Sequence, residues 1–432
     1  MVTIPKWTPS SIPASTTLTS VATSHSSALH RSLTSALKAA AKETALDNLA
    51  SLSQVIRGAQ ASLTVIDAEG ILATATDESV KSKATHEIFG ATLNLKSLTN
   101  EENVFGGAVH PAANILFLVL FSVIWLYIVL MFIKSRYVWF NVTFFFGYGL
   151  EFTGFLGRVY AGLGNETDSG YYNMQIVCLT IAPAFIMAGI YFLFAQMAVV
   201  YGRQYSALKP MWYSYFFIVS DVVSLLAQAA GGALSSAEAE NHENTDIGTY
   251  TMIGGIGFQV LSMSIFLLFW IHFFFRVNFK NNDKSSTGPL NKRSISSFTR
   301  LLLNLPCTRE HKIKLDRKYN PQFKEIRQGR LFNYFPLAVT LAVIFIYIRS
   351  IYRVVELAQG FNGYLITHEA FLMVFDALMI VFVGLIFFPF HPYWAFSGKV
   401  IKAKDIRKKR DEGPSEKAQV FDADSANAKY DF

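Results

Sequence analysis

Residues 114–132 read NILFLVLFSVIWLYIVLMF, a stretch of nineteen residues without a single charge. A helix rises 1.5 Å per residue, so about 20 mostly apolar residues cross the hydrocarbon core of a bilayer. This stretch therefore predicts a transmembrane helix. Six further apolar stretches follow, and together they predict seven transmembrane helices over residues 112–133, 138–160, 174–200, 212–234, 251–275, 332–352 and 370–390.

The composition excludes a large soluble protein. Hydrophobic residues make up 52% of the chain and charged residues only 16%, against about a quarter charged in soluble domains. A soluble helical core does not repeat apolar runs of this length seven times. We therefore expect an all-α, polytopic membrane protein.

The basic residues predict the orientation of the helices. The segment 276–331 holds fourteen Lys and Arg and the tail after His391 holds nine, whereas segments 161–173 and 235–250 hold none. By the positive-inside rule, the N-terminus faces outward and the long loop and C-terminus face the cytosol. The net charge of +7 is thus a sign of topology, and we do not expect nucleic acid as a partner.

Three regions follow from this pattern. Residues 1–110 are predicted to be an extracellular, Ser/Thr-rich and partly disordered N-terminal region, 111–395 the transmembrane domain, and 396–432 a basic cytosolic tail. The cluster from Lys399 to Arg410 is expected to attract anionic lipids of the inner leaflet. The sequon that begins at Asn165 predicts a glycan on the outer face.

Within the 276–331 loop, residues 296–305 carry the run Leu301-Leu302-Leu303 beside Arg300. This pattern predicts a short helix that lies along the membrane surface.

Charged and polar residues inside the expected spans are the candidates for function, because a charge near the bilayer centre costs about 2.5–3.5 kcal/mol on insertion scales. Their spacing of three, four or seven residues places the members of each span on one helix face. The expected substrate-binding residues are Glu151, Arg158, Asp221, Ser224, Gln228, Arg349, Arg353, Glu356 and Asp376.

The direction of each span places most of these side chains, with His368 and Glu369, in the outer half of the membrane. Two interpretations stay open. In one, the charges form a lattice of ion pairs between helices, with Arg349 or Arg353 paired to Glu151 or Asp376. In the other, they line a solvated cavity that binds a polar headgroup. Both can hold at once.

Three motifs resemble those of the fungal lipid-translocating exporter family, which includes the aminocholesterol-resistance proteins and the sphingoid long-chain base exporter of yeasts. They are EFTGFLGR at 151–158, DVVSLLAQAAGG at 221–232 and IRSIYRVVE at 348–356. The resemblance covers residues 112–395. It implies a seven-helix plasma-membrane protein that exports or translocates sphingoid bases or related amphiphiles and confers resistance to lipophilic toxins.

A sphingoid base carries an ammonium, hydroxyls and one apolar tail. Carboxylates at Glu151, Asp221 and Asp376 suit the ammonium, and Ser224 and Gln228 suit the hydroxyls. The arginines would hold these acids ionised, or would bind the ligand directly if it were a phosphorylated lipid. The membrane lipids themselves are the expected partners, and the oligomeric state stays open.

Two other functions are weighed against transport. A seven-helix lipid sensor or receptor-like regulator of membrane lipid asymmetry has the same topology, although Val200-Tyr201-Gly202-Arg203 replaces the Asp-Arg-Tyr motif of receptors. A metal-dependent lipid hydrolase is less favoured because His272 and His391 lie at opposite ends of the bundle from His368. The sequence also lacks a phosphate-binding loop. We therefore expect no enzyme, no metal and no cofactor, and rank transport first.

Overall fold

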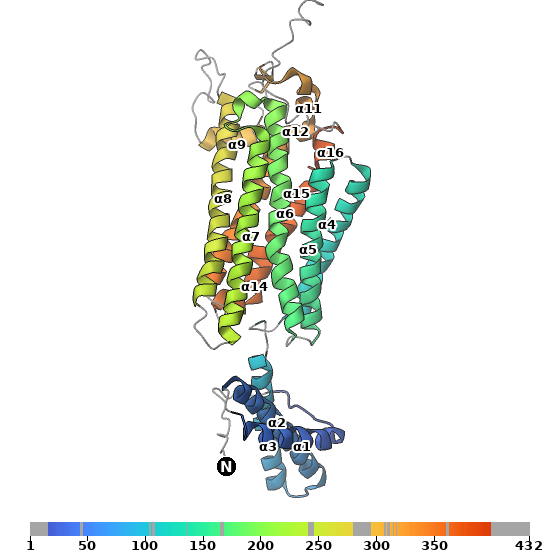
Figure 1. The fold of residues 1–432 in the computed structure, drawn as a ribbon. Helices are drawn as coiled ribbons and strands as arrows, with labels where there is room; N and C mark the ends of the chain where they lie inside the picture. The colour runs from blue at the N-terminus through green and yellow to red at the C-terminus, as the bar shows by residue number, and fades with distance from the viewer. Residues whose placement is uncertain are drawn as a thin grey trace, which may run out of the picture. The chain divides into compact units, whose positions relative to one another are not determined.

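The computed structural model shows the chain as two helical units, Met1–Gly107 and Ala108–Phe432 (Figure 1). Every secondary-structure element among the described residues is helical. The described residues are 16–43, 46–102, 105, 109–135, 137–164, 168–240, 246–279, 295–305, 308, 312–313, 315–316, 318–359 and 363–398.

The first unit consists of a short 3-10 turn and three helices. Its helices are α1 (Ser26–Ala40), α2 (Leu46–Thr74) and α3 (Glu78–Glu102), and α2 packs against both of the others. Small and branched apolar residues form the contact between α2 and α3, including Val65 and Ile88, which are buried. Helices thus occupy most of a region that was expected to be partly disordered, and the Ser/Thr-rich residues 1–15 lie outside the described part.

All seven stretches expected to span the membrane lie in helices of the second unit. The helices begin and end close to the expected bounds. They are α4 (Pro111–Lys134), α5 (Val138–Gly162), α6 (Ser169–Tyr201), α7 (Pro210–Glu240), α8 (Asp246–Phe279), α12 (Arg330–Ala358) and a final interrupted helix.

The final helix changes its geometry along its length, which the sequence analysis did not predict. After the short turn α13 (Tyr364–Thr367), it consists of α14 (Glu369–Phe371), a π-helical segment (Leu372–Ala377) and α15 (Leu378–Phe387). A short turn, α16 (Pro392–Ala395), follows. Single π-helical turns inside α-helices occur frequently at functional sites.

Six of the described helices are long and apolar enough to cross a membrane: α4, α6, α7, α8, α12 and the final interrupted helix, Glu369–Ala395. Helix α5 is of similar length, at 25 residues, but is not among the six. It carries Asn141, Glu151 and Arg158, all buried. The expected multi-pass helical fold is therefore confirmed for six helices. The seventh expected span corresponds to α5, which is not among them.

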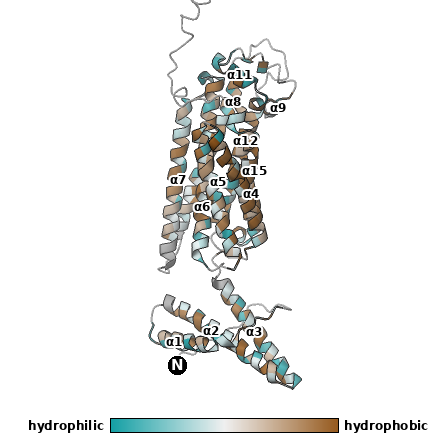
Figure 2. Cartoon of the chain, turned by 90° about the vertical axis from the view of Figure 1, so that its right-hand side faces the viewer, coloured by the Kyte–Doolittle hydropathy of each residue, from teal (hydrophilic) through white to brown (hydrophobic). Residues whose placement is uncertain are grey.

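Helices that follow one another in sequence pack side by side. Helix α5 lies between α4 and α6, α7 lies against α6 and α8, and α12 packs against α6, α8 and α15 (Figure 1). Figure 2 shows hydrophobic residues along the lengths of α4 and α15. Large apolar side chains such as Leu130 and Ile133 of α4 and Leu226 of α7 are exposed, as expected for helices that face lipid.

The contact between α5 and α6 depends on glycine. A β-carbon at Gly189 of α6 would lie 2.7 Å from the ring of Phe144, and one at Gly154 of α5 would lie 2.7 Å from Leu179. Small residues at a helix interface allow close approach of the backbones, which is how membrane helices gain packing energy. This contact holds the motif 151–158 against α6.

The predicted short helix in the 276–331 loop is present as α9 (Ile295–Leu302). Its residues Leu301 and Leu302 are buried against Phe274 and Phe298. Protein side chains therefore cover part of the apolar face that was expected to contact the membrane surface.

A second described part of the same loop caps the end of α6. Arg327 of α11 (Lys324–Gln328) pairs with Asp316 at 2.6 Å and donates to the carbonyl oxygens of Val200 and Asn320, at 2.9 and 2.6 Å. The bond to Val200 satisfies a carbonyl group that the end of α6 leaves without an intrahelical partner.

Candidate functional site

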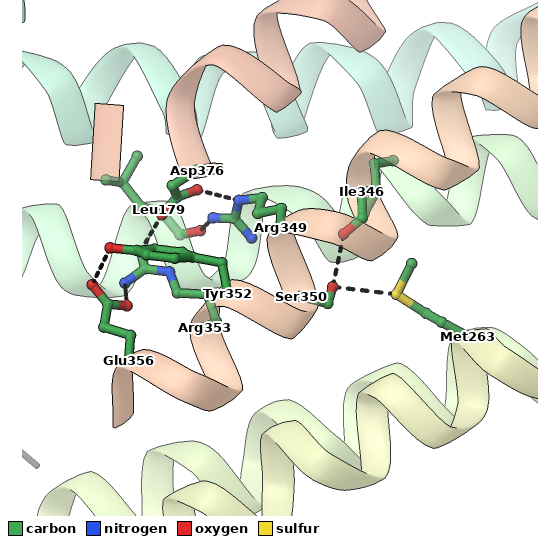
Figure 3. Close-up of polar contacts among 9 residues, drawn as sticks. All are labelled: Leu179, Met263, Ile346, Arg349, Ser350, Tyr352, Arg353, Glu356 and Asp376. Carbon is green, nitrogen blue, oxygen red and sulfur yellow. Dashed lines mark hydrogen bonds and ion pairs between the residues drawn. The ribbon is translucent and has the colours of Figure 1, made fainter. Parts of the chain in front are cut away.

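Four charged side chains from α12 and the π segment form a buried group, which we call the arginine cluster: Arg349, Arg353, Glu356 and Asp376. Arg349 pairs with Asp376 through its Nε, and Arg353 pairs with Asp376 at 2.7 Å and with Glu356 at 2.8 Å (Figure 3). Tyr352 donates its hydroxyl to Glu356 at 3.0 Å. Asp376 thus bridges two arginines, and Glu356 supplies the second negative charge.

Local helix geometry explains this arrangement. Arg349 and Arg353 are four residues apart on α12, so both guanidinium groups extend from the same face, one turn apart. Arg349 also donates to the backbone carbonyl of Leu179 on α6. The cluster therefore links α12, α6 and the π segment, and the side chain of Asp376 is only 2% exposed.

A second buried group, the Arg158 network, joins α5 to three other helices. Arg158 pairs with Glu369 of α14 and donates to Asn114 of α4 at 2.7 Å and to Gln175 of α6 at 2.8 Å. Glu369 also accepts a bond of 2.7 Å from Asn114. The direction of the spans predicted Glu369 in the same half of the membrane as Arg158, but it did not predict the pair.

Asn114 and Gln175 were missed altogether. Each is an uncharged polar residue near the start of an apolar run, and that position was the available signal. In hydrocarbon, a buried amide is retained at low cost only where it finds a hydrogen-bond partner. Their partner is the guanidinium group of Arg158.

Glu151 differs from every other acid in these groups. It is fully buried, at 0% exposure, and among the described residues neither of its carboxylate oxygens has a hydrogen-bond partner. It interacts electrostatically with Arg349, Arg353 and Asp376. The expected ion pair of an arginine with Asp376 is therefore present, whereas the corresponding pair with Glu151 does not form because Asp376 accepts both guanidinium groups.

The stripe on α7, formed by Asp221, Ser224 and Gln228, makes a third and separate group. Asp221 accepts a bond of 3.1 Å from Tyr191 of α6, Ser224 donates to the carbonyl of Gly255 at 2.6 Å, and Gln228 donates to Ser224 at 2.9 Å. Gln228 also donates to Gln259 of α8 at 3.2 Å. Eight of the nine expected residues thus lie in three groups, and Glu151 interacts with the arginine cluster only electrostatically.

Among the described residues, no three His, Cys, Asp or Glu side chains are arranged to hold a metal ion. His391 of the last turn lies beside Asn141, with 2.9 Å between Nε2 and Oδ1. This contact joins α5 to the end of the final helix. The sequon at Asn165 and the basic cluster 399–410 lie outside the described residues.

Comparison with known proteins gives a consistent assignment. Residues 144–399 match the family described as "RTA1 like protein". The sphingoid long-chain base transporter RSB1 of Saccharomyces cerevisiae strain S288c is 37% identical over 326 residues, which cover 74% of this chain and 81% of that protein.

Two other proteins of Saccharomyces cerevisiae are more distant. Protoporphyrin uptake protein 1 is 30% identical over 247 residues, covering 57% of this chain and 66% of that protein. Protein RTM1 is 27% identical over 244 residues, covering 56% and 64%. No solved structure matches the chain significantly. The matched region exceeds half of the chain and contains all nine expected site residues, so this protein belongs to the RTA1-like family, as its resemblance to fungal lipid exporters predicted.

Proposed function

We propose that this protein exports or translocates sphingoid long-chain bases, or amphiphiles of the same chemistry, across the plasma membrane. The observation that carries the proposal is the 37% identity, over 81% of its length, with a protein named as a sphingoid long-chain base transporter. Six apolar helices long enough to cross a membrane fit this activity. Resistance to lipophilic toxins would follow from export.

We further propose that α5 is the seventh span. It packs between α4 and α6, and its charged residues Glu151 and Arg158 are 0% and 4% exposed, so lipid need not contact them. Seven spans agree with the alternation of basic and non-basic connections, with the N-terminus outside and the C-terminus in the cytosol. In this orientation, the basic residues 399–410 attract anionic lipids of the inner leaflet.

The contacts support distinct roles for the acids. Asp376 and Glu356 are paired with arginines and hold α12 and the π segment together. Glu151 has no such partner among the described residues, and an ammonium group would supply one. We therefore propose Glu151 as the group that recognises the amine, with the arginine cluster shaping the polar wall around it.

The α7 stripe receives a different role. Ser224 and Gln228 bond to each other and to α8, and a β-carbon at Gly255 would lie 2.9 Å from Gln228. These short contacts favour helix packing over recognition of substrate hydroxyls. Asp221 keeps one oxygen without a hydrogen bond among the described residues.

The test uses proteoliposomes that hold only this protein and are loaded with labelled sphingosine or with its N-acylated, uncharged analogue. Glu151→Gln should weaken binding and flux of the amine by about ten- to a hundredfold, since a charge-assisted bond contributes roughly 1.5–3 kcal/mol. The N-acylated analogue carries no ammonium, so its binding and flux should change little. Asp168→Asn, which removes an exposed carboxylate at the start of α6 and keeps a capping oxygen there, serves as the control.

The other outcomes are equally informative. Equal losses for the amine and the amide would contradict amine recognition by Glu151. Specific binding of sphingosine by the wild type with no flux would contradict transport and favour the lipid sensor.

A further inference from the structure

The charges around the arginine cluster balance without Glu151. Each of the three arginines in the two buried ion-pair groups has a carboxylate partner: Arg158 has Glu369, Arg349 has Asp376, and Arg353 has Glu356 and shares Asp376. Three positive and three negative charges cancel. Glu151 is a fourth carboxylate, and it interacts electrostatically with Arg349, Arg353 and Asp376.

The donors near Glu151 are directed elsewhere. Arg349 donates to Asp376 and to the carbonyl of Leu179, and Arg353 is bound to Glu356 and Asp376. Tyr148, one turn away on α5, donates to the carbonyl of Ile380 at 3.0 Å. Cys178 of α6, a weak donor, also lies within electrostatic reach.

An ionised carboxylate in this position would be buried without compensation. Neither oxygen of Glu151 accepts a hydrogen bond from a described residue, and its exposure is 0%. Such a group is neutralised either by a bound proton or by a cation that enters beside it. A buried Glu151 therefore requires either a proton on its carboxyl group or a cation beside it.

We propose that Glu151 is a proton-exchange site, which carries a proton when no substrate is bound and releases it when a substrate ammonium takes its place. The inference rests on the proposed function, because that function supplies the cationic amine. In the exchange, the carboxyl O–H bond breaks, the proton passes to water, and the carboxylate then pairs with the ammonium. No electrons are transferred, and the net charge of the buried groups stays the same.

This exchange gives the protein a source of energy. One proton would cross against one cationic amine, so the cycle is electroneutral, and a proton gradient directed into the cell can drive the amine out. The sequence contains no phosphate-binding loop that would suggest coupling to nucleotide hydrolysis.

The experiment measures proton release on binding, with N,N,N-trimethylsphingosine as the probe. This amine has a permanent charge and no ammonium proton, so any proton released comes from the protein. Purified full-length protein in lipid nanodiscs is titrated with the probe by calorimetry in two buffers of different ionisation enthalpy. The wild type should release about one proton per bound probe, Glu151→Gln should release none, and Asp168→Asn, at an exposed carboxylate outside the site, should release as many as the wild type.

Each outcome decides a separate question. Binding of the probe to the wild type without proton release would overturn the exchange but leave the proposed function intact. Unchanged release in Glu151→Gln would exclude Glu151 as the proton source. Failure of both the probe and sphingosine to bind would instead overturn the proposed function.

Folding of the variant adds an independent check. Glutamine has nearly the shape of a protonated glutamate and the same charge, so Glu151→Gln should unfold at the temperature of the wild type. A variant that fails to fold would contradict a neutral resting side chain. Glu151→Asp, which keeps a carboxyl group, should retain proton release with a lower affinity for the probe.

Discussion

Individual carboxylates in this bundle have different surroundings although they look alike in the sequence. Asp376 binds two arginines, Glu356 binds Arg353 and Tyr352, and Glu151 has no hydrogen-bond partner among the described residues. Loss of charge therefore has a different physical consequence at each position. The paired acids compensate buried cations, whereas an ionised Glu151 would add a charge that nothing in these groups balances.

This difference predicts opposite results for two conservative substitutions. Asp376→Asn leaves Arg349 without a counter-ion and removes one of the two carboxylate partners of Arg353. It should lower the free energy of unfolding by about 3–5 kcal/mol. Glu151→Gln strands no cation and should change it little. Thermal unfolding of purified protein and the abundance of each variant at the cell surface provide the measurement. Equal destabilisation by the two substitutions would contradict the division into paired and unpaired acids.

At the scale of helices, α5 and α6 are held together by shape as well as by charge. Gly189 faces Phe144, which is 1% exposed and packs against Phe140, Tyr148 and Phe387. The ring therefore has little room to move. By contrast, a β-carbon at Gly257 of α8 would meet no atom within 4 Å.

Alanine at these two glycines should separate packing from helix propensity. Gly189→Ala forces a shift of the Phe144 ring and should destabilise the protein by about 1–3 kcal/mol. Gly257→Ala fills open space in a helix and should be neutral or slightly stabilising. Unfolding temperatures of both variants in the same detergent test this. A stable Gly189→Ala protein with full transport would show that α5 and α6 tolerate a wider separation.

At the scale of the whole molecule, the described helices of the second unit present apolar side chains to their surroundings and bury the ion pairs between them. The pairs Arg158–Glu369 and Arg349–Asp376 are 5–10% and 2–5% exposed in their side chains. The distribution of Lys and Arg between the helices remains the basis for orientation, because it depends on the sequence of the connections and not on packing.

The predicted orientation can be tested at two positions, the C-terminus and Asn165. An epitope at the C-terminus should be protected from protease in intact cells, because the nine basic residues after His391 hold the tail in the cytosol. A glycan on Asn165 should give a glycosidase-sensitive shift in mobility that Asn165→Gln removes. Cleavage of the C-terminal epitope from outside would reverse the assignment of every connection.

The sequence alone determined the helices, the family and the identity of most buried charges. The helices follow from local properties of the sequence. A chain in a bilayer must satisfy its backbone hydrogen bonds within each segment, so the length of an apolar run predicts α4, α6 and α12 directly. Polar spacing then places Arg349 and Arg353 on one face.

Only the tertiary structure decided which charges meet. Arg158 and Glu369 are 211 residues apart, and Arg349 and Asp376 lie on different helices. Their pairing depends on helix rotation and on the π segment, neither of which hydrophobic periodicity encodes. The same packing explains why Glu151 has no ion pair. Asp376 lies where it binds both Arg349 and Arg353, so neither arginine pairs with the glutamate.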